Sequence, residues 1–168
     1  MQSFLLQRAT LIDKMSVRLV RASSDDAFTS YTLTRELIEY HKALDIFELT
    51  EHRLAELIAD ESICSYIALC DGKPAGVMNY FWKYTTFTGR KILYIEDLYV
   101  RDEYRGKGVG KAFIDKAKEL AEKNDCEQIE LKCINWNKSS AEFYKAVGFE
   151  ADNQWISFVM EKTLFQKP

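Results

Sequence analysis

The chain has 168 residues, 47% of them hydrophobic, and 23 Lys and Arg against 26 Asp and Glu give a net charge of −3. This composition predicts a folded domain with a sizeable core. A net negative charge argues against general nucleic-acid binding, which needs excess positive charge. No apolar run approaches the roughly 20 residues that span a bilayer, so we expect neither a nucleic-acid nor a membrane partner.

The cysteine pattern argues against a metal site. The four cysteines include no C-x-x-C pair, and both histidines, His41 and His52, lie far from them in sequence. Three of the cysteines fall in predicted strands, where we expect buried free thiols: Cys64, Cys70 and Cys133. Free thiols suit a reducing compartment, so we expect a cytoplasmic protein without a metal.

The first half of the chain predicts a strand followed by two helices. Residues 1–14 are expected to be an N-terminal extension, and Met15 begins "MSVRLVRA", whose alternation predicts a strand over 16–22. Capping residues from Ser23 to Asp26 open a segment with apolar residues at helical spacing up to Leu44. Thr50 is the expected N-cap of a second helix, over 51–61. We expect residues 15–168 to form a single domain.

The second half alternates strands and helices. Strands are expected at 63–70 and 73–84, joined by an Asp71-Gly72 turn, and at 90–100 after a turn at Gly89. An amphipathic helix follows from Val109 to Ala121, then a strand over 127–134 and a helix over 138–149 with Gly148 at its C-terminal cap. A closing strand is expected over 155–162, with a further short strand near residue 150. The order predicts a mixed α/β fold.

The stretch "YRGKGVG", residues 104–110, combines glycines, basic side chains and the start of a helix. The N-terminus of a helix exposes N–H groups and carries partial positive charge, and glycine permits close approach of a ligand, so the stretch predicts a phosphate-binding loop. The alternative is a glycine-rich turn with its lysines in solvent. The spacing fits neither a P-loop nor the dinucleotide fingerprint G-x-G-x-x-G.

The glycine loop resembles the acetyl-coenzyme A (acetyl-CoA) loop of the GNAT N-acetyltransferases, in the form Arg105-x-x-Gly108-x-Gly110. The downstream "NWNKSSAEFYKAVGF" is also similar to that family, and "LYIEDLYVRDEYRGKGVG" looks closer still to its spermidine/spermine and thialysine acetyltransferase branch. The resemblance implies a central, mostly antiparallel sheet of six to seven strands flanked by about four helices. It also implies acetyl-CoA as co-substrate and a homodimer formed through the 84–91 turn and the closing strand.

Several residues acquire cofactor roles from this resemblance. The strand before the loop would bond the pantetheine arm, and the loop would hold the pyrophosphate. Asn137 and Ser140 match positions that contact the cofactor arm, although Asn137 also reads as a helix N-cap. The implied cofactor-binding residues are Leu98, Tyr99, Val100, Arg105, Gly106, Lys107, Gly108, Val109, Gly110, Asn137, Ser140 and Tyr144.

The same resemblance assigns catalytic roles. An alkylamine with a pKa near ~10.4 is protonated at neutral pH and must lose a proton before it attacks a thioester. Glu96 would accept that proton through water, Asp97 would contact the amine, and Tyr144 would act as the acid for the departing thiolate. The alternatives are that Tyr144 is a core aromatic and that Glu96 or Asp97 merely faces solvent.

The expected acceptor is a small cationic amine, either a diamine, a polyamine or a lysine analogue. The family places its acceptor site beside the helical region, which holds eight acids here: Glu36, Glu39, Asp45, Glu48, Glu51, Glu56, Asp60 and Glu61. These acids also fit ordinary solvated helix faces. His41, Phe87 and Trp155 are further candidates for substrate binding, although His41 and Phe87 depart from the residues usual in that branch. Two alternatives remain, an acetyltransferase of peptide lysines or N-terminal amines and a non-catalytic acyl-coenzyme A sensor.

Overall fold

The computed structural model describes residues 16–161 and 164, which form two compact units. The first unit ends at Lys132 and the second begins at Cys133. The expected extension over residues 1–14 lies outside the described residues, and the single domain expected over 15–168 stays a prediction. No helix within 16–161 is long and apolar enough to cross a bilayer.

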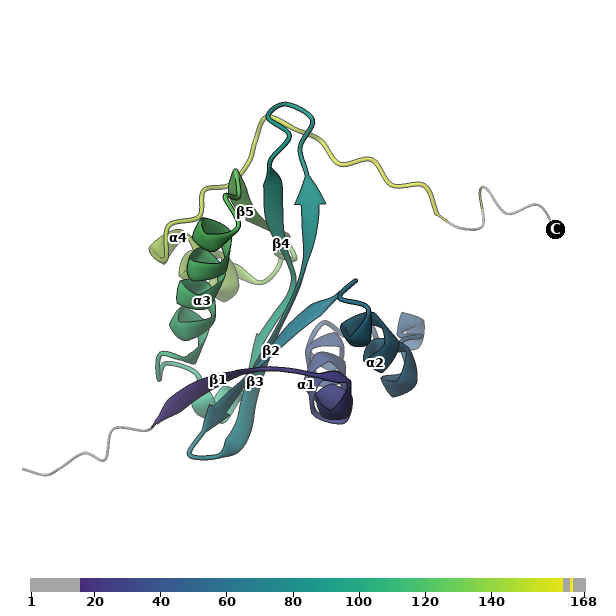
Figure 1. Ribbon diagram of the computed structural model, residues 1–168, viewed down its shortest axis with the longest axis vertical. Helices are drawn as coiled ribbons and strands as arrows, with labels where there is room; N and C mark the ends of the chain where they lie inside the picture. The colour runs from purple at the N-terminus through teal and green to yellow at the C-terminus, as the bar shows by residue number, and fades with distance from the viewer. Residues whose placement is uncertain (1–15, 162–163, 165–168) are drawn as a thin grey trace, which may run out of the picture. The chain divides into compact units, whose positions relative to one another are not determined.

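The first unit is built on a five-stranded mixed sheet in the order β1-β2-β3-β4-β5 (Figure 1). Its first four strands pair antiparallel with their neighbours, and β5 pairs with β4 in parallel. The α/β class is therefore confirmed. The strands are β1 Val17–Arg21, β2 Cys64–Cys70, β3 Lys73–Tyr84, β4 Lys91–Val100 and β5 Gln128–Leu131.

Helices cover both faces of this sheet, with α1 and α2 on one face and α3 on the other (Figure 1). The bounds are α1 Ala27–Tyr40, α2 Glu51–Ala59 and α3 Val109–Lys123, with short 3₁₀ turns at Ser24–Asp26, Leu44–Ile46 and Asp102–Tyr104. The predicted cap of α2 is confirmed, because the Thr50 side chain accepts a hydrogen bond of 3.1 Å from the Arg53 amide.

Apolar side chains fill the space between the helices and the sheet. On the α1 side, Leu33 packs with Ile67 and Val77, and Tyr99 lies against this cluster. From α3, Phe113 and Ile114 are fully buried. Because burial of each large apolar side chain contributes roughly 1.5–3 kcal/mol, these two contact layers hold the sheet and the first three helices together.

The turn between β2 and β3 forms as predicted. Asp71 and Gly72 both have positive φ, 49° and 79°, as a two-residue turn between antiparallel strands requires. The extent of β5 differs from the prediction, because this strand ends at Leu131 rather than at 134. Cys133 therefore lies beyond the strand and is only partly buried, while Cys64 and Cys70 are buried as expected.

The second unit contains one helix, α4 Lys138–Ala146, among its described residues. The strands predicted near residue 150 and over 155–162 are wrong for their described part, since residues 150–161 form no strand. The predicted count of six to seven strands is accordingly too high. The alternating pattern is present, but a strand also needs a neighbour to pair with, and the pattern cannot supply one.

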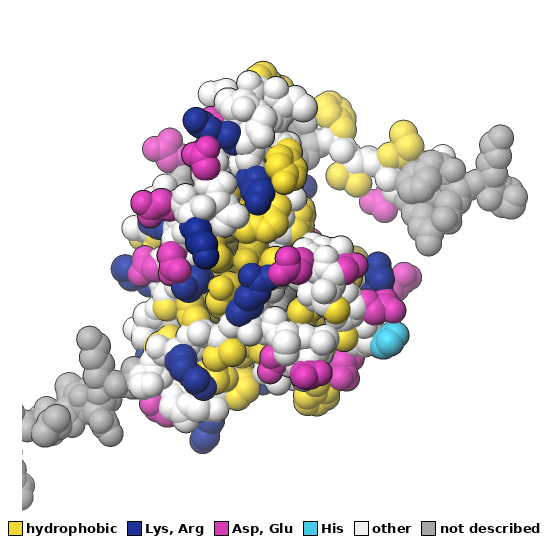
Figure 2. Space-filling view, in the orientation of Figure 1, with side chains coloured by type: hydrophobic (Ala, Val, Ile, Leu, Met, Phe, Trp, Pro, Cys, Tyr) yellow, Lys and Arg dark blue, Asp and Glu magenta, His cyan; other side chains and the backbone are white. Residues whose placement is uncertain are grey.

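The apolar side chains of this C-terminal segment lie exposed to solvent (Figure 2). Phe158 is 91% exposed and Trp155 is 72% exposed. The others are Ile156, Val159 and Met160. A run of exposed large apolar residues is unusual for a surface that stays in water.

We expect Gly76→Ala to lower the free energy of unfolding by about 3 kcal/mol or more. A Cβ at this position would clash with the carbonyl oxygen of Tyr99 and come within 3.2 Å of the Phe113 ring, and neither can move freely. Gly89→Ala is the matched control, because its Cβ would enter open space and only its φ of +73° is unfavourable; it should cost about 1 kcal/mol. Chemical denaturation measures both, and equal losses would contradict the close approach of β3 and β4.

Candidate active site

Two adjacent acidic residues lie at a bulge between β3 and β4. Asn79 is paired with Asp97 and the next residue, Tyr80, with Ile95, so Glu96 is the extra residue in β4. A bulge of this kind locally re-aims side chains and is common beside active sites. Glu96 is exposed and Asp97 is partly buried, so the two carboxylates have different surroundings.

Burial raises the pKa of Asp97 to about 6, the neighbouring Glu96 carboxylate adds to the rise, and a hydrogen bond from Asn79 opposes it. The Asn79 amide nitrogen donates to Asp97 Oδ2 at 2.9 Å. A carboxyl group with this pKa changes charge just below neutral pH, which is typical of functional sites. Asp97 is ionised above about pH 6 and can then hold a cation.

The glycine loop joins the end of β4 to the first turn of α3. Gly106 and Gly108 have φ of 70° and 86°, and Gly108 is the N-cap residue of α3. Both conformations favour glycine, and the start of a helix leaves its first amide groups without partners inside the helix. Val109 is only 1% exposed, so this residue anchors the first turn of α3 in the core.

Basic side chains around this loop are partly engaged by the protein. Arg105 Nε donates to the Val100 carbonyl at 3.0 Å, and its guanidinium lies 2.9 Å from Asp102 and 5.1 Å from the centre of the Tyr40 ring. Lys111 is paired with Asp115 at 2.6 Å. Gly106, Lys107 and Gly108 of the loop are exposed, while these side chains would have to exchange partners to bind an anion.

An ion pair that sequence reasoning missed links α1 to the end of β4. Arg101 donates to both oxygens of Glu36, at 2.8 and 2.6 Å, and its Nη1 donates to the Pro74 carbonyl at 2.8 Å. The hydrogen bonds from Arg101 raise its pKa despite partial burial. A planar, bidentate pair fixes direction as well as distance, so it holds α1 against the strand that carries the acids. Nothing in the local sequence indicates this partner, which is 65 residues away.

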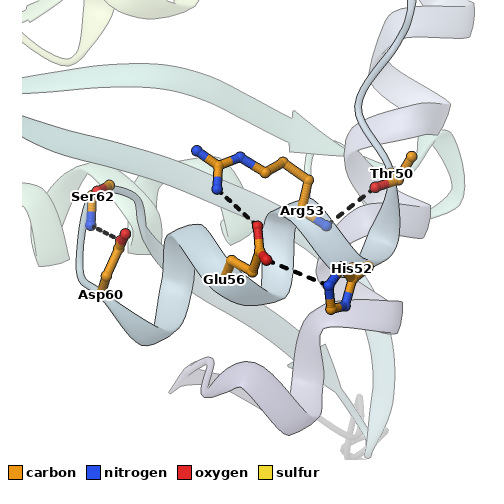
Figure 3. A network of polar contacts seen from close by, with 6 residues as sticks. All are labelled: Thr50, His52, Arg53, Glu56, Asp60 and Ser62. Carbon is orange, nitrogen blue, oxygen red and sulfur yellow. Dashed lines mark hydrogen bonds and ion pairs between the residues drawn. The ribbon is translucent and has the colours of Figure 1, made fainter.

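Several acids of the helical region are neutralised by neighbours rather than turned toward a ligand. On α2, Glu56 meets Arg53 at 2.8 Å and His52 at 3.4 Å, as Figure 3 shows. Asp60 accepts a hydrogen bond from the Ser62 amide at the end of the same helix. Glu61 is paired with a side chain of β1 at 2.7 Å. For these residues the solvated-face interpretation fits better than a cation-attracting wall.

The other three predicted substrate-binding residues lie outside β4, the strand that carries the two acids. His41 follows α1, and burial lowers its pKa, so it is neutral at pH 7. Phe87 is 87% exposed at the tip of the β3–β4 hairpin. At about 3.3 Å per residue, the tip lies more than about 15 Å along β4 from Glu96. Trp155 belongs to the second unit and is exposed there.

In the second unit, the remaining predicted residues belong to α4: Asn137 is its N-cap, and Ser140 and Tyr144 lie within the helix. The Asn137 side-chain oxygen accepts a hydrogen bond of 3.1 Å from the Ser140 amide, which confirms that Asn137 is an N-cap. At the other end, Gly148 has a φ of 104°. The Gly148 amide donates to the Lys145 backbone carbonyl at 3.1 Å, and the Phe149 amide donates to the Tyr144 backbone carbonyl at 2.9 Å. This is a Schellman motif, and it confirms the predicted end of α4.

The Schellman motif also orients Tyr144. Its ring meets the Phe149 ring edge to face, with centres 5.8 Å apart, which is the apolar contact that accompanies such helix ends. Burial, with a smaller contribution from the Cys133 sulfur, raises the pKa of Tyr144 to about 12. Its hydroxyl therefore stays protonated throughout the physiological range and is available as a donor.

Comparison with known proteins agrees with the mixed sheet and its flanking helices. The chain belongs to the acetyltransferase (GNAT) family, whose sequence pattern matches residues 26–149, and it is an N-acetyltransferase that depends on acetyl-CoA. Among the described residues 16–161 and 164, no group of three or more His, Cys, Asp or Glu side chains is placed to hold a metal ion.

Two curated relatives fall in the branch named above. A thialysine N-epsilon-acetyltransferase of Sus scrofa is 34% identical over 87% of this chain and 93% of its own length. A spermidine/spermine N(1)-acetyltransferase-like protein of Homo sapiens is 28% identical over 84% of this chain and 21% of its own length. An aminoglycoside acetyltransferase from a soil metagenomic sample, solved with trehalose, has a TM-score of 0.75 at 17% identity over 86% of this chain and 95% of its own, so it shares the fold.

We expect Gly108→Val to weaken acetyl-CoA binding at least tenfold. The Cβ would enter the open space before α3, where a phosphate would sit, and the φ of +86° is unfavourable for valine. Gly89→Val is the matched control, with a similar φ of +73° and open space at a turn outside the loop. Isothermal titration of both folded variants measures the affinity. Unchanged affinity in Gly108→Val, or an equal loss in Gly89→Val, would remove the loop from the site.

Proposed function

We propose that this enzyme transfers the acetyl group of acetyl-CoA to a primary amine of a small cationic acceptor, by direct attack in a ternary complex. The observation that carries the proposal is Asp97, a partly buried carboxylate next to the exposed Glu96 at the β4 bulge. A diamine or lysine analogue carries one charge to be held and one nitrogen to be deprotonated, and the two acids offer one group for each task. The names of the curated relatives support this class of acceptor.

The donor would lie along β4 and the glycine loop. Pairing with β5 covers β4 only from Ile92 to Ile95, so beyond that point the backbone of Leu98, Tyr99 and Val100 has no strand partner in β5. We propose that the pantetheine arm bonds to this stretch and that the amides from Arg105 to Gly110 hold the pyrophosphate. The amide of Leu98 would then stabilise the charge that develops on the thioester oxygen.

In the reaction proposed here, Glu96 accepts the proton of the attacking ammonium group through water and Asp97 holds the charge on the rest of the acceptor. The amine nitrogen bonds to the thioester carbon, the carbon–sulfur bond breaks to release the coenzyme thiolate, and the second proton of the bonded nitrogen passes to water, which leaves the neutral amide. Tyr144, with a pKa of about 12, donates a hydrogen bond to that thiolate. Complete proton transfer from Tyr144 to the thiolate, whose thiol has a pKa of about 8.5, would be unfavourable by roughly 3.5 pKa units, so stabilisation by the hydroxyl hydrogen bond is the larger part of its role.

We further propose a cytoplasmic homodimer. Phe87 at the exposed hairpin tip and the exposed apolar residues 155–160 are the surfaces that a second copy would cover. Phe87 could reach an acceptor site only in such a partner, because its own Glu96 lies far along the strand.

We expect Tyr144→Phe to reduce turnover by roughly 10²–10⁴-fold with little change in fold, because only one hydroxyl group is removed. Tyr84→Phe is the control, since Tyr84 is 68% exposed at the end of β3. Stopped-flow measurement of the first turnover ensures that the chemical step is observed. If Tyr144→Phe retains the wild-type rate of this step, Tyr144 is a packing residue.

We expect Asp97→Asn to raise KM for a small diamine about tenfold or more while it changes kcat less, since uniform binding is lost and the proton path survives. For the wild type, kcat/KM with the diamine should fall below about pH 6, because protonated Asp97 no longer attracts an ammonium group. A neutral-chain monoamine should lack the rise in KM and the additional fall near pH 6, and should show only the steady fall in kcat/KM that follows from protonation of its own amine.

Glu96→Gln should instead lower kcat most at neutral pH and recover as pH rises, because more of the acceptor is then already deprotonated. The measurement is a set of pH–rate profiles on the diamine, the monoamine, a lysine analogue and a peptide panel. Equal losses on both small amines without recovery would contradict the two roles. Wild-type activity on peptides alone would assign the chain to protein acetylation.

A further inference from the structure

A row of buried polar side chains crosses three strands behind Asp97. Ser65 on β2 is paired with Asn79 on β3, and Asn79 is paired with Asp97 on β4. Paired residues of neighbouring strands project to the same face of a sheet, so the three side chains form one line. Helix α1 covers this line with Ser30 and Thr34, which are four residues apart and therefore share a helix face.

These side chains are enclosed by the core. Ser30 and Ser65 are 0% exposed, Asn79 is 2% exposed and Thr34 is 4% exposed. Buried polar groups are unfavourable unless hydrogen bonds satisfy them, and apolar residues of the same shape would serve a core equally well. Packing alone therefore does not account for four polar residues in this place.

Their hydrogen bonds fix the orientation of the Asn79 amide. Its nitrogen donates to Thr34 Oγ1 at 2.9 Å and to Asp97 Oδ2 at 2.9 Å, which uses both of its hydrogens. Its oxygen accepts from Ser30 Oγ at 3.4 Å, and Ser30 Oγ lies 2.7 Å from Ser65 Oγ, which can donate to it in turn. A reversed amide would turn its oxygen toward a carboxylate and lose these donors.

We propose that Asn79, held by Ser30, Ser65 and Thr34, is the positioning residue for the Asp97 carboxylate at the acceptor site. The proposal rests on the proposed function for the acceptor, but its central claim concerns Asp97 itself. The groups that α1 and β3 turn toward this line are neutral, and the charged neighbour that acts on Asp97 is Glu96 of its own strand. The Asn79 donor keeps Asp97 ionised near neutral pH, although burial and Glu96 both favour the protonated form.

The direct test is the pKa of Asp97, measured by carbon-13 NMR of its side-chain carboxyl group, with Asp97→Asn identifying the signal. We expect Asn79→Leu to raise this pKa by at least about one unit, a tenfold change in the ionisation constant, because leucine has similar size and no donor. An unchanged pKa in folded Asn79→Leu would overturn the proposal.

Two substitutions at Thr34 distinguish an effect on the position of the Asn79 amide from a general loss of protein stability. Thr34→Val keeps the shape and removes the hydroxyl that holds the amide, whereas Thr34→Ser keeps the hydroxyl and removes a methyl group. We expect the pKa of Asp97 to rise in Thr34→Val by about half a unit and to stay at the wild-type value in Thr34→Ser. If Asn79→Leu does not fold, equal pKa values in the two Thr34 variants overturn the proposal.

Kinetics then connect the carboxylate to its acceptor. In Asn79→Leu, KM for the diamine should rise at pH 7 and return toward the wild-type value as pH rises above the new pKa, while KM for a neutral-chain monoamine stays unchanged. An equal, pH-independent rise for both amines indicates general damage and overturns the positioning role. If wild-type enzyme acetylates neither amine, the acceptor proposal fails, and the NMR result still decides whether Asn79 controls Asp97.

Discussion

The β-bulge at Glu96, where β4 has one residue more than β3, is the constraint on which the proposed site depends. Side chains alternate across a strand, so an inserted residue reverses the faces of everything that follows it. The bulge lets Ile95 remain in the core and Asp97 face α1, while Glu96 is exposed between them. Without it, two neighbouring acids could not be combined with a continuous apolar face on the same strand.

Electrostatics in this molecule act over short distances. Glu56 of α2 is paired with its own neighbours, and the bidentate pair of Glu36 with Arg101 braces α1 rather than attracting a ligand. Asp97 differs from these acids, because its environment raises its pKa to about 6, close to neutral pH. The charge at the site is therefore set by the few groups in contact with Asp97, and salt should affect it less than it affects the surface pairs.

Local rules predicted the elements that depend on neighbours in sequence. Thr50 and Asn137 are the helix caps that their side chains indicate, and the Asp71-Gly72 turn and the Gly148 helix end follow from backbone conformation. The glycine loop was predicted as a phosphate-binding loop from its own residues, and the resemblance to a known family added acetyl-CoA as its ligand and the roles of the two acids.

The features that sequence reasoning missed all depend on distant pairing. Nothing near Asn79 indicates that Ser65 and Asp97 flank it, since that follows from the register of three strands. The segment over 155–161 shows the opposite case, in which a strand-like pattern has no partner strand within the described chain. The second unit nonetheless contains a self-sufficient element. Because the closing bonds of α4 end at Phe149, the orientation of Tyr144 is settled before the chain leaves the helix. Segments after Phe149 can therefore change in length and composition without disturbing the Tyr144 hydroxyl group. With the roles proposed above, acceptor preference and assembly would be free to diverge while the chemistry is kept.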